Sequence, residues 1–180
     1  MPLTAFTVSK HLTDYDQIQK LYQTVFPANE QIKWSWLMRK ARSKNVEFLS
    51  YYDDNTFVGF SYMIHQPTFD FLFYLAVAPD RHSQGYGGQI LDWLNTKHPD
   101  MPIILEIEPL DEHADNLEPR QRRLAFYQKH GFQLTKHTVT EDGTTYTILA
   151  NQSSVDVQPL TKLYRWFFRP FNHRHHISVQ

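Results

Sequence analysis

The chain has 180 residues, of which 41% are hydrophobic and 15% aromatic, so it is long enough for one folded core and short for two. Its formal net charge of −1 argues against general nucleic-acid affinity, and the absence of cysteine excludes disulfides and a cysteine acyl-enzyme. No apolar run approaches the ~20 residues of a membrane span and no secretory signal is visible, so we expect a cytoplasmic protein without a transmembrane segment.

Apolar periodicity predicts strands and helices in a mixed order, without a repeat or a low-complexity linker. The expected strands lie at residues 5–9, 46–52, 57–65, 69–77, 101–107, 132–139 and 144–150. The expected helices lie at residues 13–26, 32–43, 88–97 and 118–128. Because hairpins and crossovers alternate, the sequence predicts one α/β domain over residues 1–150 with a mixed sheet.

The stretch from Leu75 to Leu91 reads as a strand, a glycine-rich turn and a helix. Within four residues, directly before the helical pattern, stand Gly85, Gly87 and Gly88. Such a turn presents backbone N–H groups at a helix N-terminus, where an anion is favoured. A P-loop is excluded because Gln89 follows the last glycine, where a lysine would be required. A dinucleotide-binding fingerprint is excluded because its third glycine is absent from this turn. An ordinary strand–helix connection is the alternative interpretation.

The turn resembles motif A of the GNAT superfamily of acetyl-CoA-dependent N-acetyltransferases, whose pattern is [RQ]-x-x-G-x-[GA]. The pattern falls on residues 82–87, with His82 at the first position and Arg81 one residue earlier. A second stretch, LAFYQKHGF at residues 124–132, resembles the family's motif B, N-x-x-A-x-x-F-Y-x-x-x-G-F. Arg120 and Arg123 replace its Asn and Ala. The resemblance to bacterial-type members covers residues 4–150.

The resemblance implies the GNAT fold, a mixed, mostly antiparallel central sheet with a splay between strands 4 and 5 and helices on both faces. It implies acetyl-CoA as co-substrate and no metal. The fourth strand, the turn and motif B would supply the cofactor contacts, through Leu75, Ala76, Val77, Arg81, His82, Ser83, Gln84, Gly85, Tyr86, Gly87, Gly88, Arg120 and Tyr127. For Arg81 and His82, a solvated turn is the alternative.

Acetyl transfer to an amine needs an acid for the leaving thiolate and an uncharged amine. By resemblance, Tyr127 is the acid, and a phenol with a pKa of ~10 suits that role; a packing role is the alternative. Glu106 and Glu108 are one residue apart on a predicted strand and therefore share a face. They could deprotonate or attract the amine, or be ordinary polar-face residues. The acidic loop at residues 111–115 is expected to be solvated rather than metal-binding.

Residues 151–180 form an extension outside the resemblance. A basic amphipathic helix is predicted there, with one apolar side made of Leu160, Leu163, Tyr164, Phe167 and Phe171. Its opposite side carries Lys162, Arg165 and Arg169. Docking on its own domain, a homodimer contact and binding to an anionic membrane surface all stay open.

We therefore expect an N-acetyltransferase that moves an acetyl group from acetyl-CoA to a small-molecule or peptide amine by direct transfer in a ternary complex. No nucleic-acid partner is expected. One alternative is a catalytically lapsed acyl-CoA-binding module of the same fold. Another is a membrane or partner adaptor that acts through the C-terminal helix.

Overall fold

The computed structural model describes residues 2–111, 114–170 and 176–180. The strands are β1 (Thr4–Thr7), β2 (Val46–Asp53), β3 (Thr56–His65), β4 (Asp70–Val77), β5 (Ile103–Ile107), β6 (Gln133–Glu141), β7 (Thr144–Ala150) and β8 (Ile177–Val179). The helices are α1 (Tyr15–Val25), α2 (Trp34–Lys40), the 3-10 turn η1 (Pro79–Arg81), α3 (Tyr86–Lys97), α4 (Leu117–Lys129) and α5 (Pro159–Phe168). Within these described ranges, every helix is too short or too polar to cross a membrane.

The strands form one sheet in the order β1-β2-β3-β4-β5-β7-β6-β8. The pairs β1–β2, β2–β3, β5–β7, β6–β7 and β6–β8 are antiparallel. The pair β4–β5 is parallel, with Asp70 opposite Ile103 and Phe71 opposite Ile104. This is the mixed, mostly antiparallel sheet that the family resemblance implied. β8 and η1 were not predicted.

The chain divides into two compact units, and neither is a continuous segment. Unit 1 consists of Met1–His65 and Leu72–His98, and unit 2 of Gln66–Phe71 and Pro99–Gln180. β4 therefore gives its first two residues to unit 2 and the others to unit 1. The predicted domain boundary at residue 150 stays a prediction, because the two units are defined by contacts within the chain and not by where the sequence resemblance to a family ends.

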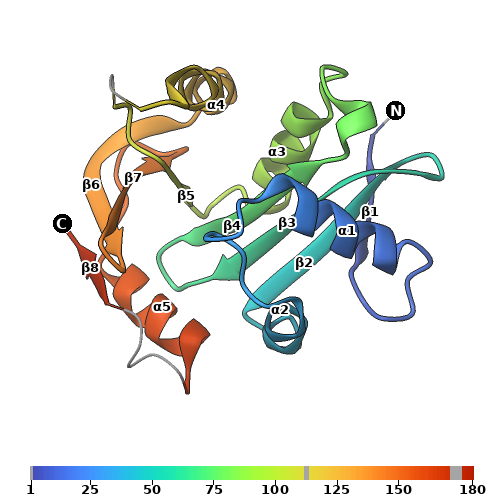
Figure 1. Cartoon of the computed structure of the whole chain (residues 1–180), viewed down its shortest axis with the longest axis horizontal. Helices are drawn as coiled ribbons and strands as arrows, with labels where there is room; N and C mark the ends of the chain where they lie inside the picture. The colour runs from blue at the N-terminus through green and yellow to red at the C-terminus, as the bar shows by residue number, and fades with distance from the viewer. Residues whose placement is uncertain (1, 112–113, 171–175) are drawn as a thin grey trace. The chain divides into compact units, whose positions relative to one another are not determined.

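In unit 1, helices pack on both faces of the strands (Figure 1). On one face, Trp34 of α2 contacts Phe48 of β2 edge-to-face, with ring centroids 5.6 Å apart. On the other face, Trp93 of α3 contacts Tyr51 of β2 at 5.4 Å. Residues 48 and 51 are an odd number of positions apart, so the two helices cover opposite faces.

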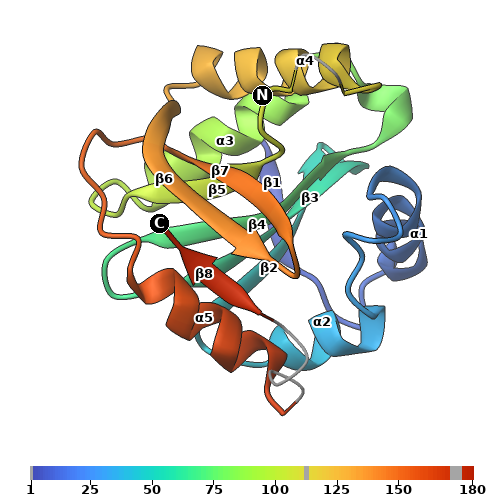
Figure 2. The ribbon, with the colours of Figure 1, turned by 60° about the vertical axis from the view of Figure 1, so that its left-hand side comes forward.

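In unit 2, β5, β7, β6 and β8 pair in that order, and α5 contacts β8 (Figure 2). The predicted apolar side of α5 is buried: Leu160, Leu163, Tyr164 and Phe167 are each at most 2% exposed. Phe171, the fifth predicted member of that side, lies outside the described residues. The apolar side of α5 thus packs within its own chain, and the homodimer contact stays a prediction.

Candidate active site

The glycine turn has the backbone geometry of an anion site. Gly85 is the N-cap of α3, and its φ of 83° lies in the left-handed region that glycine adopts without strain. The first bond inside the helix runs from the Gln89 N–H to the Gly85 carbonyl, at 3.1 Å. The N–H groups of residues 86–88 precede it and have no acceptor within the helix. Together with the helix dipole, these donors favour a phosphate.

The side chains that lead into the turn are engaged in holding its shape. The His82 Nε2–H donates to the carbonyl of Val77, the last residue of β4, at 2.9 Å. Gln84 Nε2 donates to the Asp80 carbonyl at 3.0 Å, and Ser83 has a φ of 62°. The histidine that departs from the family pattern therefore fixes the end of β4.

Two further contacts anchor this region. The Tyr86 hydroxyl donates to Asp53 Oδ2 at 2.7 Å, and this hydrogen bond raises the pKa of the tyrosine. Arg81 Nε lies 3.4 Å from Oδ2 of the neighbouring Asp80. The start of α3 is thus joined to the end of β2, which holds the N–H groups of residues 86–88 in place.

The β4 backbone at the predicted pantetheine contacts is closely approached by Gly59 of β3. A Cβ built on Gly59 would lie 2.3 Å from the Ala76 carbonyl oxygen and 3.1 Å from the Val77 Cα. Any side chain at this position would displace β4. Sequence reasoning missed Gly59, although an isolated glycine in a strand pattern is the usual signal of a close backbone approach.

Tyr127 lies in α4 and packs between two rings, with centroids 5.2 Å from Phe126 and 5.7 Å from Phe132. Burial raises the pKa of its hydroxyl to about 12, and the nearby Arg123 opposes that rise. The hydroxyl has no hydrogen-bond partner among residues 2–111, 114–170 and 176–180. It is therefore a protonated phenol near neutral pH with its donor still available.

Glu106 of β5 is held by the C-terminal helix. The Tyr164 hydroxyl donates to Glu106 Oε2 at 2.7 Å, while Oε1 is buried without a hydrogen-bond partner in the described part of the chain. Burial raises the pKa of Glu106 to about 8; the Tyr164 bond opposes the rise, and the charge of Glu141 adds to it. The carboxyl thus changes charge close to neutral pH. Tyr164 was predicted only as a packing residue.

Glu108 has different partners, because β5 ends at Ile107. Its Oε1 lies 3.1 Å from Arg120 Nη2, and its Oε2 accepts from Arg123 Nη1 at 3.2 Å. Arg120 also donates to the Asn116 side chain and to the Pro109 carbonyl, both at 2.8 Å. Glu108 and Arg120 therefore fasten the start of α4 to the end of β5.

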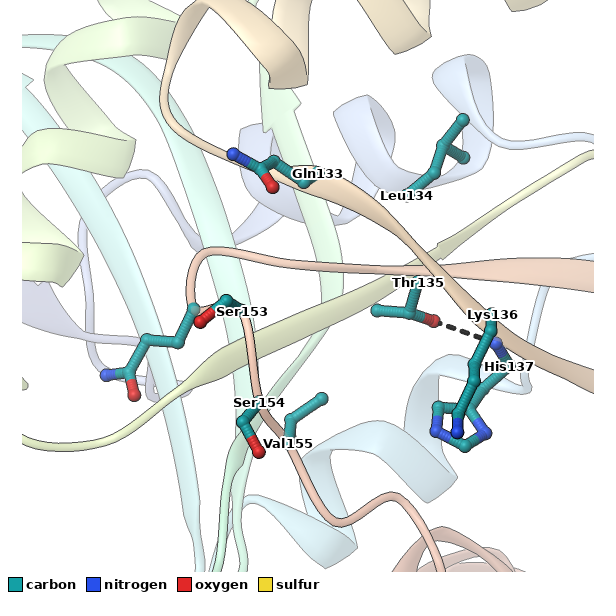
Figure 3. A pocket seen from close by; sticks show the side chains of 9 residues that line it. Gln133, Leu134, Thr135, Lys136, His137, Ser153, Ser154 and Val155 are labelled. Carbon is teal, nitrogen blue, oxygen red and sulfur yellow. Dashed lines mark hydrogen bonds between the residues drawn. The ribbon is translucent and has the colours of Figure 1, made fainter.

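The predicted residues fall into two local groups. The turn and the backbone of Leu75, Ala76 and Val77 belong to unit 1, whereas Glu106, Glu108, Arg120 and Tyr127 belong to unit 2. A separate hollow of about 410 Å³ in unit 2 is lined by residues 133–137 and 152–155 (Figure 3). Its lining includes none of the predicted site residues.

A sequence profile described as "Acetyltransferase (GNAT) domain" matches residues 44–134, which include both motifs. YjbC of Bacillus subtilis (strain 168) is 41% identical over 66 residues, 37% of this chain. That stretch spans only 32% of YjbC, so the match covers about a third of this relative.

Solved structures of the same fold align over most of the chain. A GNAT-family protein from Bacteroides thetaiotaomicron has a TM-score of 0.74 and 21% identity, covering 94% of this chain and 97% of that one. A GNAT-family acetyltransferase from Elizabethkingia anophelis with acetyl-CoA bound has a TM-score of 0.57 and 16% identity, covering 83% and 97%. An aminoglycoside 6'-N-acetyltransferase complexed with coenzyme A has a TM-score of 0.62 and 17% identity, covering 85% and 99%. At these identities, the likeness establishes the fold.

Proposed function

The chain belongs to the GNAT family of acetyltransferases, and from that premise we propose that it transfers an acetyl group from acetyl-CoA to an amine. The observation that carries the proposal is the left-handed Gly85 cap at the start of a 12-residue helix, where the N–H groups of residues 86–88 have no acceptor within the helix. The cofactor's pyrophosphate would accept from those groups. The backbone of Ala76 and Val77 would pair with the pantetheine arm, as in strand addition.

The reaction we propose is direct transfer in a ternary complex. The amine nitrogen bonds to the acetyl carbon, the carbon–sulfur bond breaks, and the thiolate of coenzyme A takes up a proton. A cysteine acyl-enzyme is impossible because the sequence contains no cysteine. Positioning both substrates together supplies much of the rate acceleration in such reactions.

We assign protonation of the thiolate to Tyr127. Its hydroxyl, with a pKa of about 12 and no hydrogen-bond partner among the described residues, stays protonated at neutral pH and can donate. The aromatic contacts with Phe126 and Phe132 hold the ring, so that removal of the hydroxyl alone would leave the packing in place.

We assign deprotonation of the amine to Glu106 rather than to Glu108. Both oxygens of Glu108 are engaged by guanidinium groups of α4, so accepting a proton would cost those bonds. Glu106 has one oxygen without a hydrogen-bond partner in the described chain and a pKa of about 8, which suits a base working near neutral pH.

The experiment that tests the proposal measures release of coenzyme A from acetyl-CoA while amines are varied. The panel contains polyamines, peptide N-termini and aminoglycosides, the last because a structure of similar fold is an aminoglycoside 6'-N-acetyltransferase. Acetyl-CoA binding is titrated in parallel with the wild type and with Gly87→Glu, which places charge where the pyrophosphate would lie. Equal binding by both folded proteins would refute the assignment of the turn.

A lapsed acyl-CoA-binding module is the second candidate, and it rests on the engagement of Glu108 by Arg120 and Arg123. These arginines stand where the family pattern has Asn and Ala. Tight acetyl-CoA binding without release of coenzyme A for any amine would favour this candidate. Release that depends on an added amine would favour the enzyme.

A further inference from the structure

Three side chains with metal-binding atoms meet in unit 1. Glu47 comes from β2, His65 from the end of β3, and His98 from the C-cap of α3. One carboxylate oxygen or imidazole nitrogen of each lies within 4.8 Å of the corresponding atoms of the other two. We propose that this Glu47–His65–His98 cluster binds a divalent transition-metal ion, for which zinc is the probe we choose.

The fold explains why these three residues meet although they are far apart in sequence. Glu47 pairs across the sheet with the residue two positions before His65, so the two side chains are diagonal neighbours on one face. Tyr51, on the same face of β2, packs against Trp93 of α3. α3 therefore covers this face, and its last turn brings the His98 ring to 5.1 Å from the His65 ring.

The atomic spacing suits a shared ion. Glu47 Oε1 lies 3.6 Å from His98 Nε2, and this oxygen is buried without a hydrogen-bond partner in the part of the chain that the structure describes. Zinc bonds of ~2.0–2.1 Å to nitrogen and oxygen place two tetrahedral ligand atoms roughly 3.4 Å apart. Small side-chain adjustments would therefore bring the cluster to metal-binding geometry.

Two neighbours of the cluster act on it in opposite electrostatic senses: the Lys97 ammonium opposes a second cation while it orients the carboxylate, and the carbonyl end of α3 favours one. The ammonium of Lys97 bonds the other oxygen of Glu47, Oε2, and lies 4.9 Å from the Trp93 ring centroid. A metal-ligating carboxylate commonly has such a second partner, which fixes its direction. The carbonyl end of α3, where His98 stands, carries partial negative charge.

The donor set selects the kind of ion. Two imidazoles and one carboxylate suit zinc and its neighbours in the first transition row, whereas calcium and magnesium prefer oxygen ligands. The glycine turn stands at the other end of α3, about 18 Å away for a helix of 12 residues. The metal would therefore join β2, β3 and α3, and it would take no part in binding the pyrophosphate at the turn.

The test uses the full chain, freed of metal by a chelator and then dialysed. Zinc is titrated by calorimetry and by competition with a chromogenic chelator, and Tm is measured with zinc or calcium. We expect one zinc per chain, a Tm rise of roughly 5 °C at saturating zinc by mass action, and no rise with calcium. His65→Ala and His98→Ala should each lower zinc affinity at least tenfold. His11→Ala, which removes an exposed histidine of the same unit, should keep the wild-type affinity.

The competing explanation is that Glu47 only forms ion pairs with Lys97 and a protonated His98. It predicts no zinc binding by the wild type, and that result would overturn the proposal whatever the variants do. Equal zinc affinity in the wild type, His65→Ala and His98→Ala would also overturn it, because the ion would then bind elsewhere. Should an alanine variant fail to fold, Glu47→Gln provides the comparison, since it keeps the side-chain shape and removes the anionic ligand.

Discussion

Replacing Gly59 with alanine tests whether the β4 backbone is the cofactor's binding edge. The added Cβ would lie 2.3 Å from the Ala76 carbonyl oxygen, whereas ordinary contacts begin at 3.4 Å, so the strands must separate locally by about 1 Å. Strain of this kind in a packed core typically costs ~1–3 kcal/mol. For a chain of this size, that corresponds to a fall in Tm of roughly 2–12 °C. Because Ala76 and Val77 would also move, loss of one backbone hydrogen bond should raise the Kd for acetyl-CoA about 2–10-fold.

The assay combines thermal unfolding with a calorimetric titration of acetyl-CoA at a temperature well below both Tm values. Val58→Ala is the matched control, because it removes fully buried methyl groups from the neighbouring position and adds nothing against β4. We expect it to lower Tm by a comparable amount while the Kd stays near wild type. A Gly59→Ala protein with the wild-type Tm and Kd would refute the close approach. A lower Tm with an unchanged Kd would refute the role of this edge in binding.

Four other predictions follow from the site. Gly87→Glu should abolish the rise in Tm that acetyl-CoA causes by binding; a retained rise would contradict the pyrophosphate assignment. Tyr127→Phe should lower kcat about 10²–10⁴-fold with little change in acetyl-CoA affinity, and wild-type turnover would remove the residue from the catalytic group. If Glu106 is the base, the rate should rise with pH along a titration curve whose midpoint lies near 8. Tyr164→Phe should move that midpoint to higher pH, because the lost hydrogen bond favoured the charged form of Glu106. An unmoved midpoint would count against Glu106. The free energy of unfolding should fall as pH rises from about 4.5 to 8, because folded Glu106 retains a proton that the unfolded chain releases, and Glu106→Gln should flatten this dependence.

The sequence was sufficient for most elements because local apolar periodicity determines them. The helix predicted at residues 118–128 is α4, Leu117–Lys129, and Gly131, just after it, has a φ of 86°. β8 was missed because three residues carry too little periodicity, and the strand exists through pairing with β6. The helix predicted at residues 32–43 is shorter as α2, Trp34–Lys40, because beyond it the backbone bonds tighten to a three-residue spacing, from Arg42 to Arg39 and from Ser43 to Lys40.

The candidate site divides in the same way between local and long-range determinants. The Gly85 cap is a local feature, since glycine spacing and the following helical pattern are enough to predict it. The partners of Glu106 and Glu108 are not local. Tyr164 is 58 positions from Glu106, and the common face predicted for the two glutamates ends where β5 stops at Ile107. Long-range pairing therefore decided which carboxylate kept an oxygen without a hydrogen-bond partner in the described chain.

The interleaving of the two units has a consequence for synthesis on the ribosome. The chain emerges N-terminus first, and unit 1 is complete once His98 has appeared. Residues 66–71, already exposed by then, belong to unit 2 and must wait for β5, with which Phe71 pairs at Ile104. Phe69 and Phe71 are at most 1% exposed in the finished fold, so the nascent chain presents two uncovered aromatic rings for that interval. A fragment of residues 1–98 should therefore bind a hydrophobic dye and the complete chain should not; equal dye binding would show that these rings find cover without β5.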